Sequence, residues 1–185
     1  MKEYIIQFKP FLVFLAKFAA SYLLLTFVYQ TYLHQFDEKK MEVDGFTQLV
    51  ANQSQKIISV FNANCYTEGN PKEASVKLFY NGKWVARIIE GCNALSVIIL
   101  FVSFVIAFTG KLKPTLLFIL FGSLLIHFFN IIRIALLCMA LYHYPKYDSL
   151  LHDVIFPIVI YGLVFLLWIV WVNKYSFYAE KPTKK

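Results

Sequence analysis

Long apolar runs alternate with polar segments along the chain, and this pattern indicates helices that cross a membrane. The first run, residues 11–33, is apolar apart from Lys17 and a few neutral polar residues. A helix of that length covers about 30 Å, which matches the hydrocarbon thickness of a bilayer. Further runs follow at 94–109, 115–142 and 154–172. We therefore expect an all-α polytopic membrane protein with about four transmembrane helices.

Residues 34–91 interrupt this pattern with a mixed polar sequence. Apolar residues recur at helical spacing over 46–61, behind a possible N-cap at Asp44, which predicts an amphipathic helix on the membrane surface or against the spans. Two β-rich stretches then flank Asn81 and Gly82, a pair that tolerates the positive φ angles of a two-residue hairpin turn. We expect an extracytoplasmic insertion made of a small helix and a β-hairpin.

The composition agrees with a membrane protein. Of the 185 residues, 59% are hydrophobic and only 16% are charged, which excludes an ordinary soluble domain. A net charge of +7 is compatible with nucleic-acid binding, but the basic residues fall mostly beside the apolar runs, where they act as topology signals. We therefore expect membrane lipid and no nucleic acid as a partner. The first run exceeds a signal-peptide core and no small-residue cleavage pattern follows it, so we expect it to be retained.

Lysines gather at the ends of the runs that the pattern places on one side. That side carries nine lysines against Glu3 and Glu180, whereas the short loop at 143–153 carries one lysine and two aspartates. The positive-inside rule therefore predicts a multi-pass protein of the cytoplasmic (inner) membrane with cytoplasmic termini and a basic cytoplasmic tail at 173–185. The starts of the second and fourth runs then lie at the outer face. The nine lysines are Lys2, Lys9, Lys17, Lys111, Lys113, Lys174, Lys181, Lys184 and Lys185.

Cys92 stands where the polar insertion meets the second apolar run. Taken alone, it is explained as a small buried hydrophobe. Arg133 lies within the third run, where a charge near the bilayer centre costs about 2.5–3.5 kcal/mol and needs a compensating partner. Asn130 and His127 lie one and two turns earlier and complete a polar stripe on one side of that helix. The stripe is also compatible with a purely structural role between helices, an interpretation favoured most for His127.

Two histidines compete for an acid/base position. His143 follows the third run, whereas His152 opens the fourth run much as Cys92 opens the second, so we prefer His152. Asp153 is placed to orient the imidazole, although adjacent side chains usually point apart, which favours a solvated acid.

The other two cysteines, Cys65 and Cys138, have no metal-ligand spacing with any residue, and three cysteines form no disulfide framework. We expect no metal and no cofactor. A disulfide between Cys65 and Cys92 in an oxidising compartment stays open as an alternative, and it would inactivate a nucleophilic Cys92.

The combination of residue types indicates acyl transfer from a peptide. A thiolate is the reactive form of cysteine, and a neighbouring cation raises its fraction. A histidine within reach pairs with the thiol and later protonates a leaving amine. An arginine orients a peptide carbonyl or stabilises the oxyanion of a tetrahedral intermediate. Cys92, Arg133 and His152 supply these three groups at the face predicted to be the outer one.

The order of the motifs also resembles a known family. A Gly-Cys-Asn-Ala segment at 91–94 opens the second run, an Asn-Ile-Ile-Arg-Ile segment at 130–134 lies in the third, and His152 opens the fourth. Over about residues 75–165 this order is similar to the exosortase/archaeosortase family of polytopic cysteine transpeptidases. The family often has a small hydroxyl residue and glycine after the cysteine, where this chain has Asn93 and Ala94.

The resemblance implies roles for single residues and a class of substrate. Cys92 corresponds to the nucleophile, Arg133 to the catalytic arginine and His152 to the catalytic histidine. The implied substrates are secreted proteins that end in a short motif, a transmembrane helix and a basic tail, and that are cut before the helix.

The leading prediction is therefore a single membrane-embedded domain over 1–185 that acts as a cysteine peptidase or transpeptidase at the outer face. The alternative is a non-catalytic four-span assembly or scaffold subunit in which the arginine only joins helices. A small transporter is disfavoured because the chain has no internal repeats or broken helices. The catalytic residues are Cys92, Arg133 and His152, with Asn93, Asn130 and His127 as substrate-binding or supporting residues.

Overall fold

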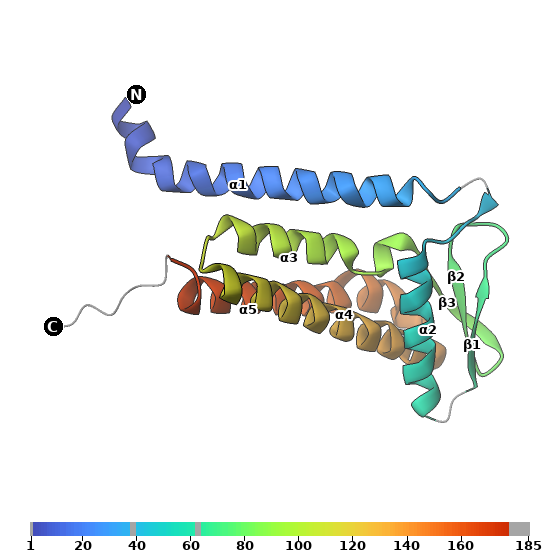
Figure 1. Ribbon diagram of the computed structural model, residues 1–185. Helices are drawn as coiled ribbons and strands as arrows, with labels where there is room; N and C mark the ends of the chain where they lie inside the picture. The colour runs from blue at the N-terminus through green and yellow to red at the C-terminus, as the bar shows by residue number, and fades with distance from the viewer. Residues whose placement is uncertain (1, 38–39, 62–63, 178–185) are drawn as a thin grey trace.

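The computed structural model describes residues 2–37, 40–61 and 64–177. Helices α1 (Lys2–Leu33), α3 (Leu95–Ala107), α4 (Leu112–His143) and α5 (Phe156–Lys174) run side by side along one axis (Figure 1). Helix α2 and a small sheet lie across one end of these helices, and the start of α1 and the end of α5 lie at the other. The polar insertion thus covers a single end of an apolar bundle.

Three helical segments are long and apolar enough to cross a membrane: Phe8–Leu33, Leu112–His143 and Leu150–Lys174. The chain is therefore a polytopic, mostly helical membrane protein. Helix α3, at the predicted second span, has only 13 residues, and such a helix measures about 20 Å against the about 30 Å of bilayer hydrocarbon. The fourth span stays a prediction.

Helical structure extends beyond two of the predicted apolar runs. Helix α4 begins at Leu112 and takes in Pro114, because the first turn of a helix has no intrahelical partner for its N–H groups and therefore tolerates proline. The predicted loop at 143–153 contains a 3-10 turn, Pro145–Tyr147, and a π-helical turn, Leu150–Ile155, that continues into α5. His152 consequently lies on a helical turn.

The predicted amphipathic helix is confirmed as α2 (Gly45–Val60). Its N-cap is Asp44, whose Oδ1 accepts hydrogen bonds from the backbone N–H groups of Phe46 at 3.0 Å and Thr47 at 2.9 Å. These bonds satisfy donors that the first helical turn leaves unpaired. Its apolar side, with Val50 and Ile58 completely buried, packs into the core between the sheet and α4.

The predicted hairpin is also confirmed, but it belongs to a sheet of three antiparallel strands. Strands β2 (Val76–Tyr80) and β3 (Lys83–Ile88) are joined by Asn81 and Gly82, which have φ angles of 49° and 76°. Strand β1 (Cys65–Gly69) pairs with the other side of β2, so the order is β1-β2-β3. The sequence did not predict β1 because its short mixed segment has no clear alternation of apolar and polar residues.

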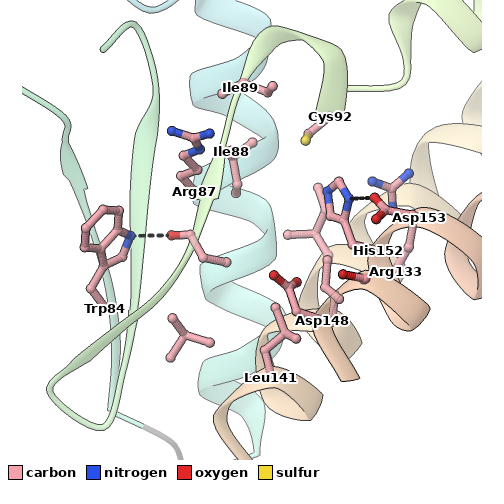
Figure 2. A pocket seen from close by; sticks show the side chains of 15 residues that line it. Trp84, Arg87, Ile88, Ile89, Cys92, Arg133, Leu141, Asp148, His152 and Asp153 are labelled. Atoms are coloured by element: carbon pink, nitrogen blue, oxygen red, sulfur yellow. Dashed lines mark hydrogen bonds and ion pairs between the residues drawn. The ribbon is translucent and has the colours of Figure 1, made fainter. Parts of the chain in front are cut away.

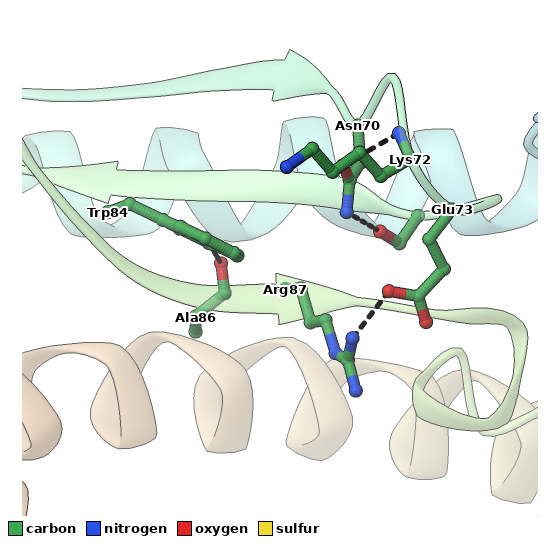
Figure 3. Close-up of polar contacts among 7 residues, drawn as sticks. Asn70, Lys72, Glu73, Trp84, Ala86 and Arg87 are labelled. Carbon is green, nitrogen blue, oxygen red and sulfur yellow. Dashed lines mark hydrogen bonds and ion pairs between the residues drawn. The ribbon is translucent and has the colours of Figure 1, made fainter.

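Side chains fix the connection between β1 and β2 and link it to β3 (Figure 3). Asn70 Nδ2 donates to Ser75 Oγ at 3.0 Å, and Asn70 Oδ1 accepts from the backbone N–H of Lys72 at 3.2 Å. Glu73, in the same connection, forms an ion pair with Arg87 of β3. These contacts stabilise the sheet at the end of β3 that leads to Cys92.

Two cores result from this arrangement. One lies between α2, the sheet and the last turns of α4, and the other lies among α3, α4 and α5. The first includes Val50, Ile58, Leu78, Ile88 and Cys138, and the second includes Phe101, Val105, Ile126, Val164 and Trp171.

Candidate active site

Cys92 lies in a 3-10 turn, Glu90–Cys92, which joins the end of β3 to the start of α3. The Cys92 N–H donates to Ile89 O at 2.9 Å, and the Asn93 N–H donates to Glu90 O at 3.1 Å. Ala94 then adopts a left-handed conformation with a φ of 66° before α3 begins. That conformation is one that glycine adopts without steric strain, whereas alanine adopts it at a cost of about 1–2 kcal/mol.

Buried hydrogen bonds hold this turn against three helices. Asn93, only 1% exposed, donates from Nδ2 to Tyr29 Oη at 3.2 Å and to Thr47 Oγ1 at 3.0 Å. Its Oδ1 accepts from the Leu95 N–H at 2.8 Å, and Tyr29 Oη donates to Glu90 Oε1 at 2.5 Å. Asn93 therefore joins α1, α2 and the start of α3 directly beside the thiol.

Helix α4 contributes the next two polar residues. Asn130 is fully buried, and its Nδ2 donates to the carbonyl oxygen of Cys92 at 2.8 Å, which fixes the turn to α4. Arg133 follows one turn later, within electrostatic range of Cys92 and of Tyr161 on α5. Its buried Nε has no hydrogen-bond partner, and it forms no salt bridge within the described ranges. The Nε–H donor is therefore unsatisfied within the described ranges.

A pocket of about 470 Å³ brings the three predicted catalytic residues together (Figure 2). It lies between β3, the last turns of α4 and the π-helical turn before α5. Its lining includes Cys92, Arg133 and His152, which belong to three separate parts of the chain. The lining residues are Trp84, Val85, Ala86, Arg87, Ile88, Ile89, Cys92, Arg133, Ile134, Leu137, Leu141, Asp148, Ser149, His152 and Asp153.

Only one of the two candidate histidines, His152, lines the pocket. His152 lines the pocket, and its Nδ1 lies 3.1 Å from Asp153 Oδ1. His143 lies at the end of α4, does not line this pocket, and contacts the rings of Tyr80 and Tyr142. The expectation that Asp153 points away from His152 was wrong, because its carboxylate contacts the ring of His152. This contact occupies Nδ1 and leaves Nε2 for proton exchange.

The family relationship follows from a comparison with known proteins. A model of the transmembrane exosortase family matches residues 9–174. This chain belongs to the transmembrane exosortase family. The matched range extends from within α1 to the end of α5 and includes Cys92, Arg133 and His152. No curated protein and no solved structure matches the chain significantly.

His127 joins two helices of this exosortase-family chain. Its Nε2 lies 2.8 Å from Gln53 Oε1 on α2, and its ring packs against Phe46. It does not line the pocket. These contacts hold α2 against α4 and agree with the structural role favoured for His127, whereas a role in substrate binding stays a prediction. Asn93 and Asn130 likewise lie outside the pocket lining, but both position Cys92.

The remaining cysteines of this exosortase-family protein are buried in the first core. All three cysteines are free thiols, so the disulfide left open between Cys65 and Cys92 is not formed. Burial raises the pKa of the Cys65 thiol above its ordinary value, which lowers its thiolate fraction at any given pH. Among the described residues, no three His, Cys, Asp or Glu side chains gather closely enough to hold a metal ion.

Sequence reasoning missed part of the pocket wall. Asp148 and Ser149 line it because the turns after α4 direct them inward, and six consecutive residues, 84–89, line it from β3 and the residue that follows. The position of Asp148 one helical turn before His152 is a signal that was present in the sequence. The contribution of β3 depends on how the sheet packs, for which the sequence holds no direct signal.

Proposed function

We propose that this exosortase-family protein is a membrane-embedded cysteine peptidase or transpeptidase. Its substrates would be secreted proteins that end in a sorting motif, a transmembrane helix and a basic tail. The observation that carries the proposal is the convergence of Cys92, Arg133 and His152 on one pocket beside the apolar bundle. The family match over residues 9–174 supports the same chemistry.

In the proposed reaction, the Cys92 sulfur attacks the scissile carbonyl and forms a tetrahedral intermediate. Arg133, whose buried Nε has no hydrogen-bond partner within the described ranges, stabilises the oxyanion. His152 takes the thiol proton and passes it to the leaving amine, so that the C–N bond breaks and a thioester remains. Asp153 accepts from the His152 ring and favours the tautomer that carries out this transfer. Water or an amine acceptor then attacks the thioester and releases Cys92.

The proposed topology has four spans, with both termini in the cytoplasm of the inner membrane and the pocket at the outer face. The short α3 is compatible with it, because its link to α4 reaches the far end of α5. Gly110 forms an isolated antiparallel bridge with Ser176, and the Phe177 N–H donates to Thr109 O at 2.9 Å. The α3 segment therefore extends from the Cys92 turn to the end of the bundle where α1 begins and α5 ends (Figure 1).

A co-expression experiment tests the proposal. The protein is expressed with secreted proteins from the same genome that share a C-terminal motif, an apolar span and a basic tail, and the cleaved products are measured by mass spectrometry. Cys92→Ala is expected to reduce the cleavage rate by at least about 10³-fold, because it removes the nucleophile. His152→Ala is expected to reduce it by about 10²–10⁴-fold.

Matched variants serve as controls. Cys138→Ala removes a buried thiol that does not line the pocket, and His143→Ala removes the competing histidine; both should retain cleavage. Full cleavage by Cys92→Ala would refute the proposal. A thiol reagent gives a second readout that needs no substrate: selective reaction of Cys92 over Cys65 and Cys138 favours the enzyme, whereas an inert Cys92 favours the scaffold alternative.

A further inference from the structure

The two edges of the small sheet have different surroundings. The outer edge of β1 is covered by α2, since Gln55 Nε2 donates to Cys65 O at 3.2 Å and Gln55 Oε1 accepts from Thr67 Oγ1 at 3.1 Å. Strand β3 ends the sheet on the other side, and no strand of the described chain pairs with its outer edge. An unpaired edge presents main-chain donors and acceptors to any extended chain that approaches it.

This open edge forms one wall of the candidate active site. Side chains of a strand alternate between the two faces of a sheet, so a pocket on one face would contact every second residue, except at a β-bulge. Strand β3 has such an irregularity where Trp84 and Ala86 pair with Phe79 and Leu78. Beyond it, the pocket still contacts every residue from 86 to 89, which means that the pocket follows the edge of β3 and not one face of the sheet.

The pocket continues along the whole strand. A second cavity of about 280 Å³ begins at Lys83 and shares Trp84, Val85, Leu141 and Asp148 with the first, so the two adjoin. Together they form a groove that leads from the hairpin turn to Cys92. At about 3.3 Å per residue, it accommodates an extended segment of about five or six residues.

The opposite wall of the groove is apolar. Ile134, Leu137 and Leu141 lie along one side of α4, at helical spacing, and face β3 across the groove. Figure 2 shows Leu141 and Cys92 at different ends of the pocket, with β3 along its side. A peptide between β3 and α4 would therefore meet hydrogen-bonding groups on one side and apolar side chains on the other.

We infer that the substrate segment preceding the scissile bond binds as a fourth strand on β3, a mode of recognition in which main-chain hydrogen bonds supply affinity. The inference rests on the proposed function, because it assumes that the scissile carbonyl reaches Cys92. Since residues before that carbonyl must lie toward the hairpin turn, the bound segment runs parallel to β3. Alternate side chains of the segment then face α4, so apolar residues are preferred with a period of two.

The test uses the full-length protein in detergent micelles and a peptide chloromethyl ketone, acetyl-Thr-Val-Thr-Val-Ala-CH₂Cl. The Cys92 sulfur forms a bond to the methylene carbon, chloride leaves, and the thiol proton passes to solvent. Two further versions of this peptide, the twins, carry N-methyl groups on their main-chain nitrogens. One twin is methylated at the first and third residues, and the other is methylated at the second and fourth. Only one of these two sets of N–H groups faces β3, so the twins should differ in alkylation rate by about tenfold or more, because two hydrogen bonds are lost.

Groove variants give a second measurement. Leu141→Trp narrows the groove at the point where the two cavities meet, whereas Leu136→Trp changes an exposed position on another side of α4. Leu141→Trp should slow alkylation by the peptide about tenfold or more, because the larger side chain would keep the peptide from forming its hydrogen bonds to β3. Its reaction with iodoacetamide, which needs no groove, should stay unchanged, and Leu136→Trp should change neither rate.

The outcomes separate the two proposals. If Cys92 reacts with iodoacetamide but both twins alkylate it at the same rate as the unmethylated peptide, strand addition to β3 is wrong and the proposed nucleophile stands. If Cys92 reacts with neither reagent, both proposals are wrong. A rate difference between the twins that Leu141→Trp abolishes establishes the binding mode.

Discussion

Both polar atoms of the Asn93 amide form hydrogen bonds that hold the turn that carries Cys92. Its Nδ2 bonds to Tyr29 and Thr47, and its Oδ1 bonds to the Leu95 N–H. All of these groups belong to a part of the molecule from which water is excluded, as the 1% exposure of Asn93 indicates. Removing one partner of a buried hydrogen bond leaves the other unsatisfied, at a cost of about 1–3 kcal/mol.

Asn93→Ala should therefore lower the free energy of unfolding by about 1–3 kcal/mol. Unfolding by denaturant in detergent micelles, followed by circular dichroism, measures the change. Asn52→Ala is the matched control, because Asn52 lies on the exposed side of α2 and bonds only to Gln48. The control should change stability by less than about 0.5 kcal/mol. Equal losses in the two variants would show that Asn93 is no structural anchor.

The backbone conformation of Ala94 explains in physical terms what differs where this chain has Asn93 and Ala94 in place of the residues of the family pattern. Its φ of 66° lies in the region that favours glycine, the residue that the pattern often carries there. Asn93 accepts from the N–H two residues later, a bond that a small hydroxyl residue can also make. The chain thus keeps the turn with different residues and bears the strain at Ala94.

At the scale of elements, close contact between α3 and α4 depends on a glycine. A Cβ added at Gly122 of α4 would lie 2.3 Å from Phe101 Cζ on α3, closer than carbon atoms can approach. Phe101 is completely buried, so its ring has little room to move. This contact fixes the distance between the helix that follows Cys92 and the helix that carries Arg133.

Gly122→Ala should consequently destabilise the protein by about 1–3 kcal/mol, since the ring or the helix has to shift. Gly162→Ala makes the same chemical change in α5, where an added Cβ meets nothing within 4 Å. That control should be neutral or stabilising by up to about 1 kcal/mol, because alanine favours a helix more than glycine does. Thermal denaturation of both variants in micelles compares them, and a stabilised Gly122→Ala would contradict the packing argument.

At the scale of the whole molecule, the polar insertion covers the end of the bundle opposite the start of α1 and the end of α5 (Figure 1). Lysines that the described chain places near that opposite end include Lys9, Lys111, Lys113 and Lys174. The membrane potential and the positive-inside rule favour a cytoplasmic location for that end. The pocket would then open at the outer face.

Cysteine labelling tests this orientation. In a background without the three native cysteines, Lys146→Cys places a thiol on an exposed turn at the pocket end, and Lys111→Cys places one at the opposite end. A membrane-impermeant maleimide should label the Lys146→Cys variant in intact cells. It should label the Lys111→Cys variant only after the membrane is permeabilised. The reverse pattern would place the pocket in the cytoplasm, and labelling of both in intact cells would rule out the four-span topology.

Local patterns in the sequence determined much of the fold. The Asp44 cap, the helical spacing of α2 and the Asn81-Gly82 turn each depend on residues close together in the chain, and each is confirmed. Helix length and apolarity likewise indicate three helical segments that are long and apolar enough to cross a membrane. These features follow from backbone hydrogen bonding and hydrophobic periodicity, which act over a few residues.

Contacts between distant segments were decided only by the tertiary structure. The sequence named Cys92, Arg133 and His152, but their meeting in one pocket depends on the packing of β3, α4 and the turn before α5. The same packing placed His127 against Gln53 and made the edge of β3 a wall of the pocket. Residue type and spacing therefore supply the chemical groups, whereas their distances depend on how helices and strands bury their apolar faces against one another.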